Sequence, residues 1–250
     1  MTIYRSFLLP KAELGNGYVI LDPRESHHLV RVFRARDSAN VEVLDGMGTC
    51  FKGRLVTADA KAARIEIDSL ERVEKAQIAV TLVQAVPKGK AMDLILRMAT
   101  EIGVAAVQPV FASHGEFCIT GERLESKLDK WRLTMIEACK QCGVKWLPDL
   151  ASPLTFKDWL DLPVKKDSLR LVASLETSRI PLHKVLSAAP FISSIQVAVG
   201  PEGDFSANEY AQMRSAKFNP VRLGANVLRA ETAAAYLLSV VDQISQKQVV

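Results

Sequence analysis

The chain has 250 residues, of which 48% are hydrophobic and 24% charged, and its formal net charge is +4. This balance excludes a largely disordered chain and fits one large domain, or a large and a small one. The mildly basic charge permits a polyanionic partner without requiring one. No stretch approaches the roughly 18–20 consecutive apolar residues of a membrane span, and the first residues lack the apolar core of a signal peptide. We therefore expect a cytoplasmic protein without a membrane partner.

Residues 1–72 have the texture of a small β-rich domain. The runs NVEVLDG, TCFKGRLVTA and AARIEIDSL alternate apolar and polar residues, which is typical of half-buried strands. Within this part, HHLVRVFRAR carries Arg31, Arg34 and Arg36. If that segment is helical, Arg31 and Arg34 lie about one turn apart and form a cationic face. A solvated surface helix accounts for the pattern equally well.

Residues 73–250 alternate strand-like and helix-like segments. Apolar strands are predicted at 78–86, 105–111, 169–176, 194–200 and 220–224. Helices are predicted at 88–103, 124–142, 179–188, 206–216 and 231–245. This alternation predicts an α/β domain with a mostly parallel sheet that helices cover on both faces.

Four cysteines show no disulfide framework. Cys139 and Cys142 form a C-x-x-C pair, but they stand near the end of a predicted helix with Gly143 as its C-cap. A zinc knuckle needs a second pair, and a redox motif precedes its helix. We therefore expect structural cysteines and no metal site.

The carboxyl ends of three predicted strands carry the features of a ligand site, and such ends are where open parallel sheets bind ligands. They read ASLET at 173–177, VGPEGDF at 199–205 and LGANVLRAET at 223–232. After the second, Ser206 and Glu209 are spaced as a capping box, with Phe205 and Tyr210 as a hydrophobic staple. The GPEG turn is thus expected to be fixed on both sides.

Several familiar sites are excluded by their missing motifs. The chain has no G-x-G-x-x-G after a strand, no P-loop, no G-x-S-x-G elbow and no H-E-x-x-H. The four histidines are not at metal-ligand spacing, and surface or satisfied histidines are expected. Glu202 would repel a phosphate group unless it turned away. A cationic ligand, or one recognised through an uncharged heterocycle, fits the turn better.

The order of these motifs carries a specific resemblance. QAVPKGKAMDLILRMATEIGV, the GPEG turn and LGANVLRAETA follow a small β domain that contains HHLVRVFR. In this order over nearly the whole chain, they resemble the RsmE family of ribosomal RNA small subunit methyltransferases, in the SPOUT superfamily. These enzymes use S-adenosyl-L-methionine to methylate N3 of a uridine in small-subunit (16S) ribosomal RNA.

The resemblance implies a PUA-like β-barrel domain for RNA at 1–72 and a SPOUT methyltransferase domain at 73–250, with a C-terminal deep trefoil knot and a homodimer. Small-subunit ribosomal RNA, or the assembled subunit, would be the partner. The implied cofactor-binding residues are Leu175, Glu176, Val199, Gly200, Pro201, Glu202, Gly203, Leu223, Gly224, Val227, Leu228, Thr232 and Ala233. The implied RNA-binding residues are Arg5, Arg31, Arg34, Arg36, Lys88 and Lys90.

By motif position, Arg229 and Glu231 are the expected catalytic residues. Uridine N3 carries a proton in the neutral base, so the base must be unpaired and the proton must leave. Arg229 could stabilise the developing uracil anion, and Glu231 could position it or act as the base. An acid in the first turn of a helix, favoured by the helix dipole, explains Glu231 equally well.

The sequence departs from the family pattern at positions expected to be charged or glycine. Met98, Lys140, Val144, Asp204 and Asn226 stand where a lysine, an acid, an arginine, a glycine and an arginine are usual. Cofactor motifs survive better than RNA-facing ones. The alternatives are a knotted RNA- or ribosome-binding protein with impaired catalysis, and a methyltransferase that acts on a different RNA site. Asp204 either caps the following turn beside Ser206 or marks this chain as a divergent member of the family.

Overall fold

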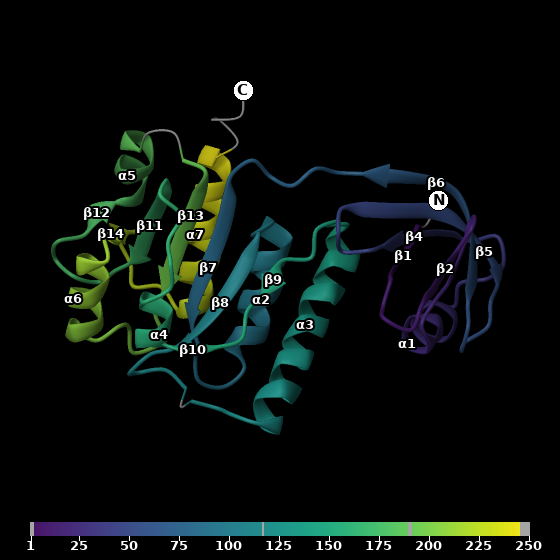
Figure 1. Ribbon diagram of the computed structural model, residues 1–250, viewed down its shortest axis with the longest axis horizontal. Coiled ribbons are helices and arrows are strands. Elements are labelled where there is room, and N and C mark those ends of the chain that lie inside the picture. The colour runs from purple at the N-terminus through teal and green to yellow at the C-terminus, as the bar shows by residue number, and fades with distance from the viewer. Residues whose placement is uncertain (1–2, 117, 190–191, 246–250) are drawn as a thin grey trace. The chain divides into compact units, whose positions relative to one another are not determined.

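The computed structural model describes residues 3–116, 118–189 and 192–245 (Figure 1). The chain divides into two compact units. The first comprises Met1–Lys75 together with Ile136–Leu147, and the second comprises Ala76–Met135 together with Pro148–Val250. No helix of the described residues is long and apolar enough to cross a membrane.

The first unit is built on a six-stranded sheet with the strand order β1-β4-β5-β6-β3-β2. In that order the strands are Tyr4–Phe7, Asn40–Leu44, Thr49–Thr57, Arg64–Arg72, Tyr18–Ile20 and Glu13–Gly15. β1 pairs with β4 in parallel, and the other pairs are antiparallel. The described pairings leave the sheet open between β1 and β2. Its core holds the alternate residues of the strands, which confirms the predicted β texture: Val19, Val41, Val43, Leu55 and Ile65 are buried.

The arginine-rich segment at 27–36 is helical only in its first half. α1 spans Pro23–His27 and continues as a short π-helix, η1, over His28–Val32. Arg34 has a φ of 56°, in the left-handed region, so the chain has left the helix before this residue. The expectation of one helical face with Arg31 and Arg34 a turn apart is therefore wrong. Leu29 and Ala35 are both buried in the same core, and the chain leaves the helix between them.

The second unit is a parallel sheet with the strand order β10-β8-β7-β13-β11-β14-β12, and β9 also pairs with β8. Every described pairing in it is parallel, as predicted. From β10 to β12 in that order the strands are Leu154–Thr155, Ala106–Phe111, Ala79–Ala85, Ser194–Val199, Ser168–Ala173, Asn219–Arg222 and Ile180–Pro181, and β9 is Asp149–Leu150. The strand β11 lies between β13 and β14, so three strand ends that are distant in sequence are neighbours.

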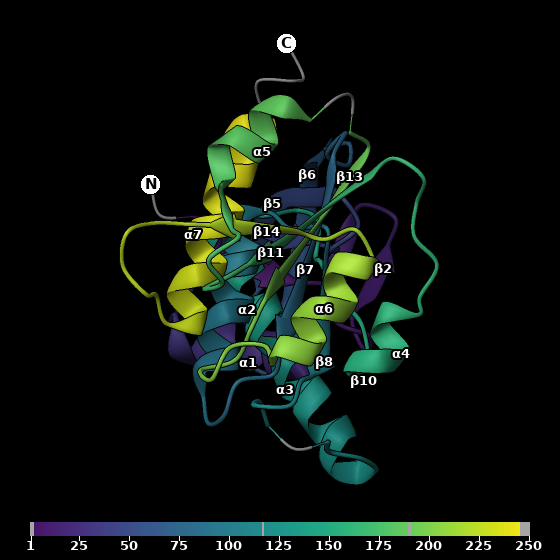
Figure 2. The ribbon, with the colours of Figure 1, turned by 90° about the vertical axis from the view of Figure 1, so that its left-hand side faces the viewer.

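Helices lie on both faces of this sheet, as the alternating pattern predicted. α2 (Ala91–Ile102) and α7 (Ala230–Ser245) lie on one face, and α4 (Phe156–Leu160) and α6 (Ala207–Ser215) on the other (Figure 2). α3 spans Glu122–Cys142, and α5 spans Leu182–Ala188. Gly103 ends α2 with a φ of 92°, a left-handed conformation that glycine adopts without strain.

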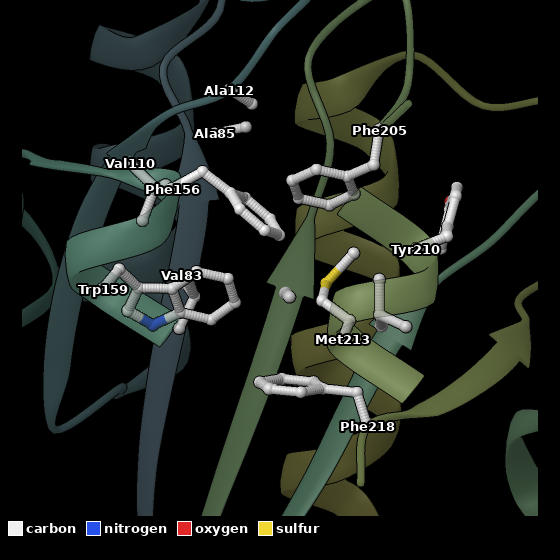
Figure 3. Close-up of a cluster of buried hydrophobic side chains, with 12 residues drawn as sticks. Val83, Ala85, Val110, Ala112, Phe156, Trp159, Phe205, Tyr210, Met213 and Phe218 are labelled. Atoms are coloured by element: carbon white, nitrogen blue, oxygen red, sulfur yellow. The ribbon is translucent and has the colours of Figure 1, made fainter. Parts of the chain in front are cut away.

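An aromatic cluster joins α4 and α6 to the sheet (Figure 3). Phe205 packs edge-on against Tyr210 with ring centroids 5.9 Å apart, which confirms the predicted staple. Phe205 also meets Phe156 of α4 at 6.0 Å. Rings in such tilted or edge-on arrangements add about 0.5–1.5 kcal/mol per pair beyond the area they bury. The start of α6 is therefore held by packing as well as by its cap.

The carboxylate of Glu209 fixes the start of α6 more firmly than a capping box requires. It is 4% exposed and accepts from the backbone N–H of Ser206 at 2.7 Å and from its hydroxyl at 2.9 Å. It also accepts from the backbone N–H of Ser113 at 2.8 Å and from that hydroxyl at 3.1 Å. Burial opposes the charge, but the hydrogen bonds from Ser206 and Ser113 outweigh it and lower the pKa of Glu209.

A buried ion pair joins two distant parts of the first unit. Nζ of Lys140 lies 2.9 Å from Oε1 of Glu25, and the two side chains are 4% and 2% exposed. The second oxygen of Glu25 accepts from the backbone N–H of Phe7 at 3.0 Å, and Lys140 also pairs with Glu137. The charges are thus satisfied from three elements, as buried charges must be.

We expect Lys140→Met to destabilise the first unit by about 3–5 kcal/mol, because it leaves the Glu25 carboxylate buried without its cation. Adding Glu25→Gln to this variant should recover part of the loss. Lys145→Met is the control, since Lys145 pairs with Glu71 where both side chains are partly exposed and such pairs contribute about 0–1 kcal/mol. Urea unfolding measures all three. Equal losses from Lys140→Met and Lys145→Met would contradict the buried pair.

We expect Glu209→Gln to lose about 1–3 kcal/mol at neutral pH, because an amide cannot accept from all four donors. The folded-state pKa of Glu209 is lowered, so its contribution is fully present above the unfolded value of about 4.3 and is lost as the pH falls through the lower folded value. The difference between wild type and variant should therefore shrink in acid. Glu176→Gln is the control, because that carboxylate is part of a more exposed pair. A difference that grows in acid would contradict this assignment.

Candidate functional site

Three loops meet at the carboxyl ends of β11, β13 and β14 and enclose a cavity of about 500 Å³. The loops begin at Ser174, Gly200 and Leu223, the three positions that the sequence predicted. They converge because β11 lies between the other two strands and all three run in parallel. The start of α2 and the start of α7 complete the lining, through Ala91 and through Ala230, Glu231 and Ala233.

The GPEGD turn is held in one conformation by Asp204. Its backbone N–H donates to Pro201 O at 3.0 Å, and its φ of 59° is left-handed. Oδ1 of Asp204 accepts from the backbone N–H of Phe205 at 2.8 Å. A Cβ at Gly200 would lie only 2.9 Å from this oxygen, so the closed turn requires glycine there. Asp204 therefore closes the GPEGD turn from within.

Tyr210 connects this turn to the neighbouring strand. Its hydroxyl lies 2.8 Å from Oδ1 of Asp204 and 3.1 Å from O of Ala173, so its single proton is shared between the turn and the end of β11. Burial raises the pKa of Tyr210 far above its usual range, and the hydroxyl stays protonated as a donor. Figure 3 shows the Tyr210 ring beside Phe205 and above Met213.

The segment after β8 supports the same turn from its outer side. Nδ1 of His114 lies 2.9 Å from O of Gly203 and 3.1 Å from O of Asp204. Since both neighbours are acceptors, Nδ1 must carry the proton in this arrangement. His114 is thus a satisfied histidine, as expected, but it is satisfied by the predicted ligand turn. No signal in the sequence pointed to that contact.

Glu202 links the turn to the loop before α2. Its Oε2 accepts from the backbone N–H of Lys88 at 3.2 Å. The carboxylate also lines the cavity, together with Ala91 at the start of α2. Glu202, the acid of the GPEG turn, is therefore part of the cavity lining.

Arg229 and Glu231 both line the cavity at the start of α7. O of Arg229 accepts from the backbone N–H of Ala233 at 2.8 Å, which places Arg229 at the helix start. Among the described residues, neither the Arg229 guanidinium nor the Glu231 carboxylate has a protein hydrogen bond or ion pair. Both charged groups therefore remain available to a ligand.

Most of the residues expected at a cofactor site line this one cavity. They are Leu175, Val199, Gly200, Pro201, Glu202, Leu223, Gly224, Val227, Leu228 and Ala233. Three others, Glu176, Gly203 and Thr232, are not part of the lining. The Glu176 carboxylate is paired with Arg214 at 2.6 Å.

Sequence reasoning missed the lining residues Arg179 and Arg222, and it named Ser174 and Asp204 only as parts of the predicted strand-end stretches. Arg179 donates to the carbonyls of Leu175 and Glu176 and so fixes the loop after β11. Its place six residues after a buried strand was the available signal. Charged residues at strand ends were noted only where they formed a motif.

The residues expected to bind RNA differ in their surroundings. The Arg5 side chain has partners within the first unit. Its Nε pairs with Glu42 at 2.8 Å, and its Nη1 donates to O of Gln141 at 3.0 Å. Arg31, Arg34 and Arg36 are exposed. Lys88 and Lys90 are also exposed, and they flank the loop that Glu202 holds.

The cysteines take no part in this site. Cys139 is buried, and burial raises the pKa of its thiol to about 12, which leaves it unreactive. Cys142 is exposed and donates to O of Ala138. Across residues 3–116, 118–189 and 192–245, no group of three or more His, Cys, Asp or Glu residues could hold a metal ion.

Two family models match separate parts of the chain. A family model described as an RNA methyltransferase domain matches residues 74–242, and one described as an RNA methyltransferase PUA domain matches residues 21–68. The ribosomal RNA small subunit methyltransferase E of Synechocystis sp. is 29% identical over 96% of this chain and 78% of its own. The protein of that name from Buchnera aphidicola is 24% identical over 90% of this chain and 87% of its own.

A solved structure shares the fold over nearly the whole chain. It is a ribosomal RNA small subunit methyltransferase E from Neisseria gonorrhoeae bound to S-adenosylmethionine. It has 28% identity and a TM-score of 0.84, and the match covers 97% of this chain and 98% of that one. These matches confirm the resemblance to the RsmE family and the PUA-like character of the N-terminal part. The chain therefore belongs to the RNA methyltransferase family, among the relatives of ribosomal RNA small subunit methyltransferase E.

Proposed function

We propose that this protein transfers a methyl group from S-adenosylmethionine to N3 of a uridine in small-subunit (16S) ribosomal RNA. The observation that carries the proposal is a single cavity at three strand ends with an unpaired arginine, Arg229, in its wall. The names of the relatives and the cofactor of the Neisseria gonorrhoeae structure support the same activity. The two matched family models support an RNA substrate.

The cavity fits a small cofactor in size and in charge. Its volume of about 500 Å³ lies within the usual range of small-molecule sites. Leu175, Val199 and Val227 give it apolar walls, and Gly200 and Gly224 expose backbone there. The lining carries three acids, Glu202, Asp204 and Glu231, beside three arginines, Arg179, Arg222 and Arg229, so carboxylates are present that can face a cationic group. S-adenosylmethionine, when bound, supplies an electrophilic methyl group on a cationic sulfur.

The residues of the chain have to hold the acceptor base and stabilise its charge. Removing the N3 proton of uridine leaves an anion delocalised over the base. The Arg229 guanidinium forms no ion pair with a carboxylate among the described residues, so it can stabilise this anion. Glu231 stands two residues away and can position the base or accept its proton. The closed GPEGD turn forms one side of the cavity, and its hydrogen bonds hold its backbone groups in place.

RNA contacts are proposed for both parts of the chain, through Arg31, Arg34 and Arg36 in the domain at 1–72 and Lys88 and Lys90 in the domain at 73–250. These side chains are exposed and can contact phosphates. We further propose that the protein is a cytoplasmic homodimer and that its C-terminal part forms a trefoil knot. The homodimer and the knot rest on the family resemblance, and the cytoplasmic location rests on the expectation from the sequence.

The proposed function is tested by methyl incorporation. Small subunits from cells that lack the modification are incubated with this protein and labelled S-adenosylmethionine, and the product nucleoside is identified after digestion. We expect 3-methyluridine in 16S ribosomal RNA, with heat-inactivated protein as the control. A different methylated nucleoside would show that the protein modifies another position or another RNA. No incorporation into any RNA would overturn the enzyme assignment.

We expect Arg229→Ala to lower kcat on the order of 10²–10³-fold, because it removes a positioned charge that acts on the developing anion. The Kd for S-adenosylmethionine, measured by calorimetric titration, should change less than about threefold. Arg132→Ala on the exposed surface of α3 is the control. An unchanged kcat, or a loss that saturating cofactor restores, would show that Arg229 does not act on the base.

A further inference from the structure

An exposed aromatic surface lies at the end of η1 in the first unit. Phe33 is 44% exposed, and Val32 beside it is 55% exposed. The Phe33 ring lies against His28, with centroids 4.5 Å apart and planes at 52°, and 6.0 Å from the Tyr4 ring. Burying such side chains favours folding, so a phenylalanine kept at the surface gives up stability that it could otherwise contribute. His28 and Tyr4 are half-buried, and Tyr4 packs against the core, so Phe33 is the exposed ring of the three. We call Phe33, His28 and Tyr4 the aromatic surface.

The backbone holds Phe33 outward by anchoring both sides of it. Leu29 on the helical side is 1% exposed and Ala35 on the other side is 4% exposed, and the Ala35 N–H donates to O of Leu29 at 3.0 Å. The Phe33 N–H donates to O of His28 at 2.9 Å. Between the anchors, Arg34 adopts its left-handed φ of 56°, which costs about 1 kcal/mol or more for a residue with a side chain. The local fold thus presents Phe33 at the surface at a measurable cost.

Three arginines without side-chain partners in the described part of the chain lie within three residues of Phe33 in sequence. Arg31, Arg34 and Arg36 are exposed, and among the described residues none of them forms a hydrogen bond or ion pair through its side chain. Other arginines of the same unit do: Arg24 pairs with Glu137, and Arg54 with Asp68. The nearest acid in sequence, Asp37, already accepts from the backbone N–H of Ala58 at 3.1 Å. The positive charge here is therefore not neutralised by the protein.

A partner that matches this surface must offer a flat π face beside closely spaced negative charges. An unpaired nucleotide has both, since its base stacks on aromatic side chains and its phosphates attract arginine. We propose that the aromatic surface stacks an unpaired base of the RNA through Phe33 and His28, while Arg31, Arg34 and Arg36 contact the flanking phosphates. This rests on the proposed function, because it assumes an RNA partner. It adds a recognition role for Phe33, which no charge pattern indicates.

The test is binding of a labelled, short single-stranded oligouridine to the full chain, followed by fluorescence anisotropy over a range of salt concentrations. Stacking contributes about 1–3 kcal/mol per base, so Phe33→Leu should raise Kd about 5- to 150-fold. Phe33→Trp should retain binding. Leu70→Ala, which removes another exposed apolar side chain of the unit, should leave Kd unchanged. An oligomer with abasic positions should bind wild type and Phe33→Leu equally.

Salt dependence separates stacking from charge. Arg31→Gln should flatten the slope of log Kd against log salt by roughly 0.7, whereas Phe33→Leu should leave the slope as it is. Unchanged affinity in Phe33→Leu, or an equal loss in Phe33→Trp, would overturn the stacking role. Methyl transfer to small subunits is measured on the same samples. If Phe33→Leu raises Kd but the wild type transfers no methyl group, the proposed function is overturned and the stacking role stands. If the wild type transfers methyl groups but Phe33→Leu leaves Kd unchanged, the stacking role is overturned and the proposed function stands.

Discussion

The carboxylate of Glu209 is the interaction on which the ligand cavity depends. It accepts from two residues, Ser206 at the start of α6 and Ser113 after β8, and so fixes two segments of the second unit at one point. With α6 held there, Tyr210 reaches Asp204 and the end of β11. The cavity wall is thus shaped by residues that do not line it, as is common where backbone groups recognise a ligand.

The local parts of this arrangement were readable from the sequence. The capping box of Ser206 and Glu209 and the staple of Phe205 and Tyr210 involve residues three to five positions apart, where spacing alone fixes geometry. Parallel strands and the ends that carry the loops also followed from the alternation of elements. The long-range contacts could not be predicted from spacing. Tyr210 and Ala173 are 37 positions apart, and Lys140 and Glu25 are 115 positions apart.

Motifs located the loops but not the direction of each side chain. Glu176 and Arg179 both lie in the loop after β11, yet the Glu176 carboxylate pairs with Arg214 while Arg179 lines the cavity. At 27–36 a cationic helical face depended on the whole segment being helical, but Leu29 and Ala35 are both buried in one core and the chain turns between them. In each case tertiary packing decided between conformations that were equally good locally.

Asp204, with its left-handed backbone, also limits the mobility that Gly200 and Gly203 would give the turn. A turn with two glycines in four residues is usually mobile, and ordering it on binding a ligand would cost conformational entropy. Here the Asp204 carboxylate, the Tyr210 hydroxyl and the His114 ring make hydrogen bonds that keep the turn closed. Because these bonds belong to the folded chain, the entropy of ordering the turn is lost on folding.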